Sequence, residues 1–548
     1  MQQIIRFFRR PLFTTAVVAG ALSLMAIGGA RYWEISKNME IFASAYRAIN
    51  AEYVEQVDPS TLMRTAIDSM LAELDPYTNY FSEAQMEQLR IEVVGGWDGV
   101  GIETEVWKNE VIVREVIEDT PASVAGVRIG DRILQVDGKD TKGRKAEEVD
   151  KILNGKAGTK VEIKFMRPAT KEERTLTMER GKISRKNVPY YGMLPDGETG
   201  YIILTTFTDR AGGNIGDAIR DLQEKHKPTR FILDLRNNGG GLLIEAVNIC
   251  NLFVEKGKEI VSTRNKVVEW DRSFKTLNNP LNTNVPVIVL INERSASASE
   301  IVAGALQDLD RAVLVGRKSF GKGLVQNTKD IGYNSKIKLT TAKYYIPSGR
   351  CIQALEYKDG TPIEIPDSLR KAFKTAGGRT VYDGGGLLPD VKVEAQEPAA
   401  VVKALQRAHF IADFANAYRQ RHDSIAPAAD FRLTEADFAQ FVEQVRASGY
   451  AFDYHTNEVA NRIDSLNDAP AEMRAANARL RARLQEQKAA DIAAAKKDII
   501  RLLETEIVAR YYYERGRVQL QLREDTDVQE ATRLFNDKER FAKLLKVN

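Results

Sequence analysis

The sequence predicts a multidomain chain built around an α/β domain. Short β-branched apolar runs alternate with helical patterns between residues 183 and 395, and residues 93–182 have the strand and turn signals of a β-rich domain. Residues 401–548 contain only two glycines and two prolines and follow helical spacing. We therefore expect five parts, namely an N-terminal membrane helix, a helical segment, the β-rich domain, the α/β domain and a C-terminal helical extension: 1–34, 35–92, 93–182, 183–395 and 396–548.

The N-terminal segment predicts a membrane anchor. Residues 1–10 carry Arg6, Arg9 and Arg10 and no acid, and Pro11 to Ala30 is uncharged. As a helix this stretch spans about 30 Å, enough to cross a bilayer core. Basic residues before it favour a cytoplasmic N-terminus and export of everything after it. We expect an uncleaved single-pass anchor in the inner membrane and a periplasmic or other extracytoplasmic chain, with a cleaved signal peptide as the alternative.

Composition excludes several classes of protein. The chain is 43% hydrophobic and 28% charged, which is globular, and a net charge of +3 over 548 residues gives no case for nucleic acid. Its two cysteines, Cys250 and Cys351, exclude a disulfide framework and a multi-cysteine zinc site. We expect no metal and no cofactor. The helical pattern from Ile35 to Leu89 predicts a packed helix pair, with self-association into a homo-oligomer as a second interpretation.

One stretch, Val285 to Gln326, carries the most informative pattern. An apolar run up to Ile291 predicts a buried strand, and Ser-Ala-Ser-Ala-Ser-Glu follows at 295–300. A helical pattern comes next, so Ser297 and Glu300 fit a capping box at a helix start. A second short strand then leads to a loop in which Lys322 lies between two glycines.

This arrangement suits serine–lysine acyl transfer. A serine hydroxyl needs a base to remove its proton, and none of the four histidines lies in this stretch. A lysine can replace histidine if burial lowers its pKa, because an apolar setting disfavours the ammonium form. The amide of Ala298, in the first helical turn, can stabilise an oxyanion. The pattern predicts Ser297 as nucleophile and Lys322 as base.

Two simpler interpretations fit parts of the stretch. Ser297 in an isolated S-x-x-E pattern is more often only a helix cap. Gly316-x-x-x-x-Gly321-Lys322 is close to a phosphate-binding loop, but residue 323 is Gly where that loop needs Ser or Thr for magnesium. The residues that follow also fit a strand better than a helix, which argues against nucleotide binding.

The two motifs together resemble the carboxyl-terminal processing (tail-specific) serine protease family. They are Ser-Ala-Ser-Ala-Ser-Glu and Phe-Gly-Lys-Gly-x-Val-Gln, with 25 positions between Ser297 and Lys322, and the resemblance covers roughly residues 40 to 393. It implies that Ser297 is the nucleophile, that Lys322 is the general base, and that Gln326 orients the lysine.

Residues 93–182 resemble a PDZ domain through the run Pro121-Ala-Ser-Val-Ala-Gly-Val-Arg-Ile-Gly-Asp-Arg-Ile-Leu-Gln-Val-Asp-Gly138, with a plain β-rich module as the alternative. Such domains bind a peptide's free C-terminus as an added strand and hold its carboxylate with backbone amides. The expected groove residues are Gly99, Val100, Gly101, Ile102, Val149, Ile152 and Leu153. Asn154 stands where many family members carry an arginine.

A glycine triplet supplies the second predicted oxyanion donor. The buried-strand pattern from Phe231 runs into Gly239-Gly240-Gly241, and bare amides at a strand end suit an oxyanion, although such triplets also form plain turns. The resemblance assigns one oxyanion amide to this loop, Gly241 or else Gly240, and the other to Ala298.

Two segments have no assigned role. The family's usual end takes the form Gly386-Leu-Leu-Pro389-Asp390 after an extra segment from about Leu355 to Asp383. The charges of the helical extension predict a solvated face, with partner contact or substrate gating as alternatives.

These patterns predict a membrane-anchored, exported serine endopeptidase with a Ser–Lys dyad. It would bind apolar C-terminal tails of protein substrates in the PDZ groove and cleave nearby, with the lipid bilayer as its second partner. The rival hypothesis is a catalytically silent PDZ adaptor that binds protein C-termini.

Overall fold

The computed structural model describes residues 32–86, 95–168, 170–281, 284–358, 360–395, 397–448, 455–466 and 470–545. The chain divides into two compact units, Met1–Tyr80 and Phe81–Asn548. The predicted anchor over residues 11–30, and the end of the helical segment at 87–92, lie outside the described residues. Within the described ranges, no helix combines the length and the apolar character needed to cross a membrane.

The smaller unit contains two helices, over residues 32–52 and at α2 (Pro59–Ala72), as the helical pattern predicts. Asp58 caps α2 by accepting a hydrogen bond from the Ser60 amide, and the Tyr46 hydroxyl donates to the Pro59 carbonyl. The strand β1 (Asn79–Phe81) and the short helix η1 (Glu83–Gln85) follow.

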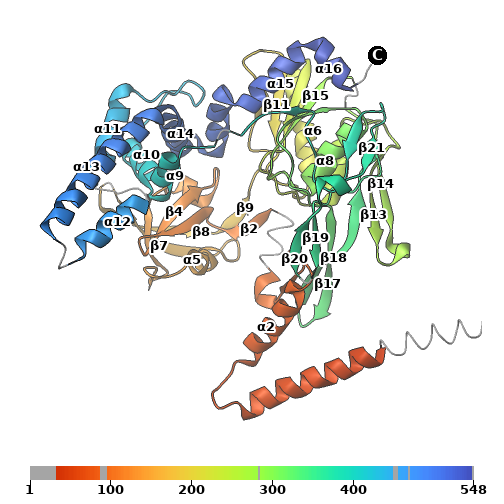
Figure 1. Cartoon of the computed structure of the whole chain (residues 1–548), viewed down its shortest axis with the longest axis horizontal. Coiled ribbons are helices and arrows are strands. Elements are labelled where there is room, and N and C mark those ends of the chain that lie inside the picture. Colours follow the sequence, from red (N-terminus) through yellow and green to blue (C-terminus); the bar gives the residue numbers. More distant parts are fainter. Residues whose placement is uncertain are drawn as a thin grey trace, which may run out of the picture. The chain divides into compact units, whose positions relative to one another are not determined.

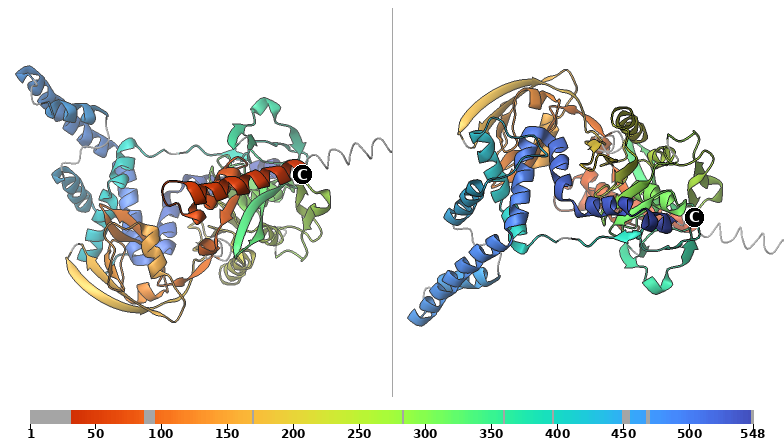
Figure 2. Two further views of the ribbon diagram at one scale, coloured as in Figure 1. Left: turned by 90° about the horizontal axis from the view of Figure 1, so that it is seen from below. Right: turned by 90° about the horizontal axis from the view of Figure 1, so that it is seen from above.

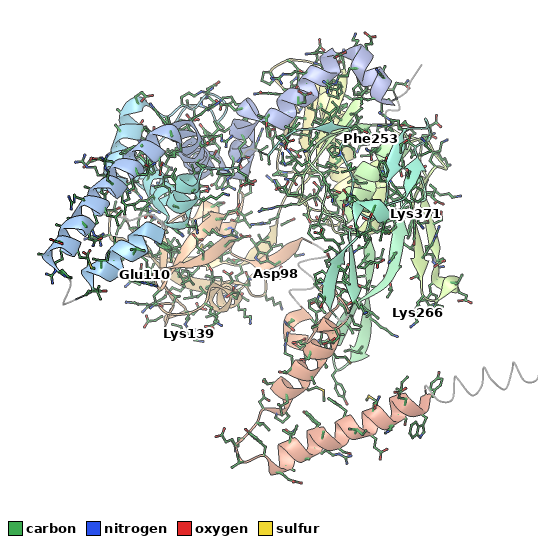
Figure 3. The ribbon with its side chains drawn as sticks, in the orientation of Figure 1. Asp98, Glu110, Lys139, Phe253, Lys266 and Lys371 are labelled. Carbon is green, nitrogen blue, oxygen red and sulfur yellow. The ribbon has the colours of Figure 1, made fainter. Side chains whose placement is uncertain are left out.

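The β-rich domain forms one antiparallel sheet in the order β3-β4-β5-β7-β8, with β6 beside β5 and a separate β2–β9 pair. Its elements are β2 (Gly96–Gly99), β3 (Ile102–Trp107), β4 (Glu110–Val116), α4 (Pro121–Val124), β5 (Arg132–Val136), β6 (Lys139–Asp140), α5 (Ala146–Leu153), β7 (Lys160–Arg167), β8 (Glu172–Glu179) and β9 (Gly181–Ser184). Glu110 and Lys139 mark this domain in Figure 3. Asp137 and Gly138 form a tight turn between β5 and β6, with φ of +47° and +72°.

The α/β core is a sheet in the order β10-β11-β12-β15-β16-β23. Only β10 is antiparallel to its neighbour. Its strands are β10 (Tyr191–Met193), β11 (Thr199–Ile203), β12 (Arg230–Asp234), β15 (Val287–Ile291), β16 (Val313–Gly316) and β23 (Val391–Lys392). The carboxyl ends of the parallel strands share one edge, so the loops that follow β12, β15 and β16 meet there.

The two faces of this sheet are covered by different parts of the chain, because side chains alternate along each strand. One face packs on α6 (Ala211–Lys225), α7 (Leu243–Cys250) and α8 (Ala298–Asp308). The other face packs on residues 518–545, which include α15 (Thr526–Asn536) and α16 (Lys538–Leu545). Figures 1 and 2 show these two helices, in dark blue, against the core strands.

A second sheet extends from the core. Its antiparallel neighbours are β17 (Leu324–Gly332), β18 (Ser335–Tyr345), β13 (Glu259–Asn265) and β14 (Arg272–Lys275). The short helix η2 (Val268–Trp270) connects β13 and β14. The segment expected from Leu355 to Asp383 forms two hairpins, made of β19 (Leu355–Lys358), β20 (Thr361–Glu364), β21 (Ala372–Lys374) and β22 (Thr380–Tyr382), with the short helix η3 (Asp367–Leu369) between them.

The C-terminal region is helical, as predicted. It contains α9 (Ala400–Arg407), α10 (Phe410–Arg421), α11 (Glu435–Ala447), α12 (His455–Asp464), α13 (Ala471–Ala494) and α14 (Lys496–Gln521), followed by η4 (Leu522–Glu524), α15 and α16. A large apolar cluster joins α9, α10, α11 and α14. The charged positions at the start of α15 are not a solvated face, because Asp525 and Asp527 form ion pairs with the core.

Candidate active site

Every catalytic and oxyanion residue predicted from sequence lines one cavity of about 650 Å³. These residues are Ser297, Ala298, Lys322, Gln326, Gly240 and Gly241. They come from three loops at the carboxyl edge of the core sheet and from the start of β17. Apolar side chains complete the walls, among them Leu243, Ile301, Leu324 and Phe274.

Ser297 sits on a strained turn between β15 and α8. Its backbone has φ of +56° and ψ of −113°, a conformation that residues with a side chain seldom adopt. A sharp strand–turn–helix of this kind exposes a serine hydroxyl above a sheet in other hydrolases. Ser297 and Glu300 form the predicted capping box at the start of α8, so Ser297 caps this helix as well as lining the cavity. No residue pattern in this stretch predicts the backbone strain at Ser297.

The neighbouring serines are buried and engaged. The Ser295 hydroxyl donates to the Leu235 carbonyl at 2.8 Å, and the Ser299 hydroxyl donates to the Asn238 carbonyl at 2.9 Å. Both side chains are fully buried. These bonds tie the serine turn to the loop that carries the glycine triplet, and they leave Ser297 as the serine of the motif that lines the cavity.

The glycine triplet presses against the serine turn. A Cβ placed on Gly240 would lie 2.8 Å from Ser297 Cβ and 2.9 Å from the Ala298 nitrogen, so only glycine fits there. The Gly240 amide already donates to Asn238 Oδ1 at 2.9 Å. Among the described residues, the Gly241 amide has no such acceptor, because the bridge to Phe207 uses the Gly240 carbonyl and the Leu242 amide. Gly241 is thus better placed than Gly240 to donate to an oxyanion.

Glu300 joins the serine turn to the lysine loop. One carboxylate oxygen accepts hydrogen bonds from the Ser297 and Lys322 amides, at 2.8 and 2.9 Å. The other accepts from the Ser319 hydroxyl and the Gly321 amide, at 2.5 and 2.7 Å. Burial raises the pKa of Glu300 to about 7, against these hydrogen bonds. The sequence pattern predicts Glu300 only as a helix cap, whereas in the structure its carboxylate holds the Ser297 turn and the Lys322 loop together.

The Lys322 loop is closely packed on its other side. A Cβ on Gly321 would lie 2.4 Å from Ala354 Cβ, and one on Gly323 would lie 2.8 Å from the Gln353 nitrogen. The buried Tyr344 hydroxyl lies 2.7 Å from the Lys322 carbonyl oxygen and 3.2 Å from that of Ser297. Gln326 is on β17, and its side-chain amide donates to the Thr340 hydroxyl at 3.1 Å.

The C-terminal helices reach the same edge of the sheet through a buried ion cluster. Arg236, three positions before the glycine triplet, contacts Asp525 at 2.7 Å and Asp527 at 2.8 Å, as well as Asp234 at 2.6 Å. Asp527 also lies 3.4 Å from Arg317, which follows β16. Burial opposes ionisation of Asp525, but Arg236 still holds its pKa below the ordinary value. The amide of Asn237 and the side chain of Asn292 extend this network toward the serine turn.

The predicted peptide groove lies between the loop before β3 and the helix α5. Gly101 has φ of +85°, and a Cβ there would lie 2.3 Å from Thr120 Oγ1. Val100, Ile102, Val149 and Leu153 are buried in the domain's apolar cluster, whereas Ile152 is partly exposed. A Cβ on Gly99 would lie 2.6 Å from Asn154 Oδ1, so the Asn154 side chain packs against this loop.

Comparison with known proteins agrees with this architecture. The family model "Peptidase family S41" matches residues 198–360, and the model "PDZ domain" matches 99–179. Two further models match outside them: "Probable PDZ-protease, C-terminal helical domain" at 401–535 and "Activating protease CtpB N-terminal domain" at 25–85. The carboxy-terminal-processing protease of Bartonella bacilliformis (strain ATCC 35685 / KC583 / Herrer 020/F12,63) is 38% identical over 333 residues, which are 60% of this chain and 76% of that protein.

The chain belongs to the carboxy-terminal-processing protease family. It is a serine-type peptidase of family S41 with a PDZ domain and a C-terminal helical domain. A Staphylococcus aureus (strain COL) relative, named "Probable CtpA-like serine protease", is 35% identical over 335 residues, 60% of this chain and 65% of that protein. The solved photosystem II D1 C-terminal processing protease is 28% identical over 64% of this chain and 92% of its own, with a TM-score of 0.36.

Proposed function

We propose that this carboxy-terminal-processing protease is an endopeptidase that uses Ser297 as nucleophile and Lys322 as general base. The contrast among the serines of the motif carries the proposal. The hydroxyls of Ser295 and Ser299 already donate hydrogen bonds to backbone carbonyls. Ser297 lines the same cavity as Lys322.

In this mechanism the substrate carbonyl lies between Ser297 and the free amides. Neutral Lys322 takes the proton of the Ser297 hydroxyl while the serine oxygen attacks the carbonyl carbon. The Ala298 and Gly241 amides donate to the oxyanion that forms. Lys322 then gives the proton to the leaving amine, and water hydrolyses the acyl-enzyme by the same route in reverse.

The C-terminal helices take part in this site by position. Asp527 contacts Arg236 and Arg317, which follow β12 and β16, and so holds the loops that carry Gly241 and Lys322. The carboxylates of Asp527, on α15, and of Asp525, which caps this helix, thereby hold two loops at the carboxyl edge of the sheet. We assign Asp525 and Asp527 as positioning residues of the peptidase, acting through Arg236.

The PDZ domain supplies the substrate-recognition step in this proposal. A protein with an apolar C-terminal tail binds along β3 and α5, with its carboxylate on the amides of the Gly99–Ile102 loop. Amidating the last residue of a test peptide should weaken binding by about an order of magnitude, since a charge-assisted hydrogen bond is worth about 1.5–3 kcal/mol. Equal affinities of acid and amide would rule out carboxylate recognition.

We also propose that residues 31–548 lie outside the cytoplasm, anchored by the apolar stretch at 11–30. The three arginines before that stretch support this orientation. Protease added to spheroplasts should digest the catalytic part. Digestion only after lysis would contradict the topology.

The dyad is tested by degradation of an unfolded protein with a free C-terminus. Ser297→Ala and Lys322→Ala should each abolish cleavage, and Lys322→Arg should be equally inactive because a guanidinium stays protonated. Ser295→Ala and Ser299→Ala should retain most activity, since each loses one buried hydrogen bond worth about 1 kcal/mol of stability.

Retained cleavage by Ser297→Ala or Lys322→Arg would refute the dyad. Absence of cleavage by the wild type, with tail binding intact, would instead favour a silent PDZ adaptor.

A further inference from the structure

A second cavity, of about 470 Å³, lies where the PDZ domain meets the C-terminal helical domain. The PDZ residues on its wall come from the end of β4, from α4 and the loop after it, from the end of β7 and from β8. The other wall comes from the end of α10 and from α14 near Tyr513. None of the predicted groove residues lines it, so it is separate from the peptide groove.

Arginine dominates this cavity. Five arginines line it, namely Arg128, Arg167, Arg174, Arg419 and Arg510, together with one acidic residue, Asp423. Two of the five are neutralised by carboxylates outside the lining. Arg167 contacts Asp131 at 2.9 Å, and Arg510 contacts Glu506 at 2.8 Å. Arg174 reaches Glu172 only at 3.8 Å.

The remaining two guanidinium groups lack a close counter-charge. In the part of the chain that the structure describes, the Arg128 side chain donates no hydrogen bond and has no carboxylate within salt-bridge distance. Arg419 donates to the backbone carbonyls of His422 and Asp423 and stacks on Tyr511 at 4.3 Å. Its Nε is buried and has no acceptor among the described residues.

These charges also repel one another. Burial, and then the guanidinium groups of Arg419 and Arg167, lower the pKa of Arg128, and Asp131 and Asp423 only partly offset this. Gathering like charges at a partly buried site is unfavourable unless an anion balances them. Planar guanidinium groups bind carboxylate and phosphate oxygens in a bidentate manner, which makes them suited to that role.

The wall at Tyr513 is strained. Tyr513 has φ of +54° and ψ of −155° in the middle of α14, where both flanking stretches are helical. Its ring packs against the apolar cluster of the PDZ domain. Strained residues of this kind gather at ligand-binding and switch sites, because the surroundings must hold them in place.

We propose that this cavity binds an oxyanion, a phosphate or carboxylate group, through Arg128 and Arg419. The ligand supplies the negative charge that the lining lacks. Because Arg128 belongs to the PDZ domain and Arg419 to α10, a bound anion strengthens the contact between the two domains. The site is distinct from the catalytic cavity and does not depend on the Ser–Lys mechanism.

The test measures the thermal unfolding midpoint of the full chain in detergent as inorganic phosphate or citrate is added, with chloride at equal ionic strength as reference. The variants are Arg128→Gln, Arg419→Gln and a control, Arg446→Gln, whose exposed side chain lies on α11. In the wild type and in Arg446→Gln, one of the two anions should raise the midpoint saturably. In Arg128→Gln and Arg419→Gln the apparent affinity should fall at least about tenfold.

Comparing phosphate with citrate distinguishes a phosphate ligand from a carboxylate ligand. Tighter phosphate binding identifies a phosphate ligand, and tighter citrate binding identifies a carboxylate ligand. Without anion, Arg128→Gln should unfold at or above the wild-type midpoint, because a repelling charge is gone. The proposal is overturned if Arg128→Gln responds to the anions like the wild type, or if neither anion gives a saturable shift. It is also overturned if Arg128→Gln, without added anion, unfolds well below the wild-type midpoint.

Discussion

The C-terminal helical domain contacts the protease core and the PDZ domain through arginines at both junctions, but the charge balance differs. At the core, Arg236 is surrounded by Asp234, Asp525 and Asp527, all within 2.8 Å. At the PDZ domain, Arg128 and Arg419 line a cavity with Asp423 as its one acidic residue. At the first junction, carboxylates of the chain itself balance the charge of the arginine, whereas at the second junction they do not.

This difference indicates that the two junctions have different functions. A buried charge whose partners are all present fixes one arrangement, and removing a partner is costly. A site with surplus positive charge is stable in one arrangement only when an anion is supplied. The core junction therefore serves as a permanent part of the catalytic unit, and the PDZ junction as one that a ligand strengthens.

Asp527→Asn removes a carboxylate from the core junction, and we expect it to have the largest effect on stability and on kcat. The change leaves Arg236 and Arg317 without one carboxylate and should cost about 3–5 kcal/mol of unfolding free energy. Displacement of the triplet and lysine loops should also lower kcat, on the order of 10²-fold, with little change in KM. Urea unfolding and peptide-cleavage kinetics measure both quantities.

Glu539→Gln, an exposed acid on α16, is the matched control and should behave as the wild type. Wild-type kcat in a folded Asp527→Asn protein would show that the junction has no role in the site.

The stability of the core junction should also depend on pH, through the carboxylate of Asp525. Because the pKa of Asp525 is held below its ordinary value of 3.8, its stabilisation is present above that pH and is lost as the pH falls below it.

Within the core, Glu300→Gln tests the hydrogen bonds that join the two catalytic segments. Each carboxylate oxygen accepts two hydrogen bonds, and an amide nitrogen cannot accept either pair. We expect a loss of about 1–3 kcal/mol for each unsatisfied donor and a reduced kcat, because the Ser297 and Lys322 segments lose their common link. An unchanged unfolding midpoint together with unchanged kcat would contradict this assignment.

A smaller effect is expected from Asp150→Asn in the PDZ domain, where a carboxylate rather than a guanidinium lacks a close counter-charge. Asp150 accepts a hydrogen bond from Thr104 at 2.8 Å, and burial raises its pKa to about 6. Its contribution to stability is full below pH 3.8 and is lost as the pH rises through about 6.

Asn can accept the same bond without titrating. Asp150→Asn should therefore stabilise the protein above pH 6 by no more than about 1 kcal/mol, after allowance for solvent screening, and flatten this part of the pH dependence. Thermal unfolding over the pH range measures it, and an unaltered pH dependence would show that Asp150 does not titrate there.

Local patterns predicted the architecture of the site. The apolar run to Ile291, the serine motif and the glycine-flanked Lys322 each occupy a few adjacent residues, and the structure has a strand, a helix start and a tight loop there. Spacing alone also placed strands and helices in the PDZ and core domains, because their apolar periodicities are regular.

Contacts between distant segments could not be predicted in the same way. Arg236 and Asp527 are 291 positions apart, and nothing local distinguishes Asp527 from a solvated acid. The backbone strain at Ser297 and Tyr513 depends on surrounding packing rather than on residue type. The choice of Gly241 over Gly240 rests on the Asn238 side chain, which turns back on its own loop.

The most direct test of the central claim is to map the residue that a serine-reactive fluorophosphonate modifies. We expect a single adduct on Ser297 in the wild-type protein, formed faster as the pH rises because the base must be neutral. Lys322→Ala should form none, and Ser295→Ala and Ser299→Ala should react like the wild type. An adduct on Ser295 or Ser299, or equal labelling of Lys322→Ala, would contradict the assignment of the Ser297–Lys322 dyad.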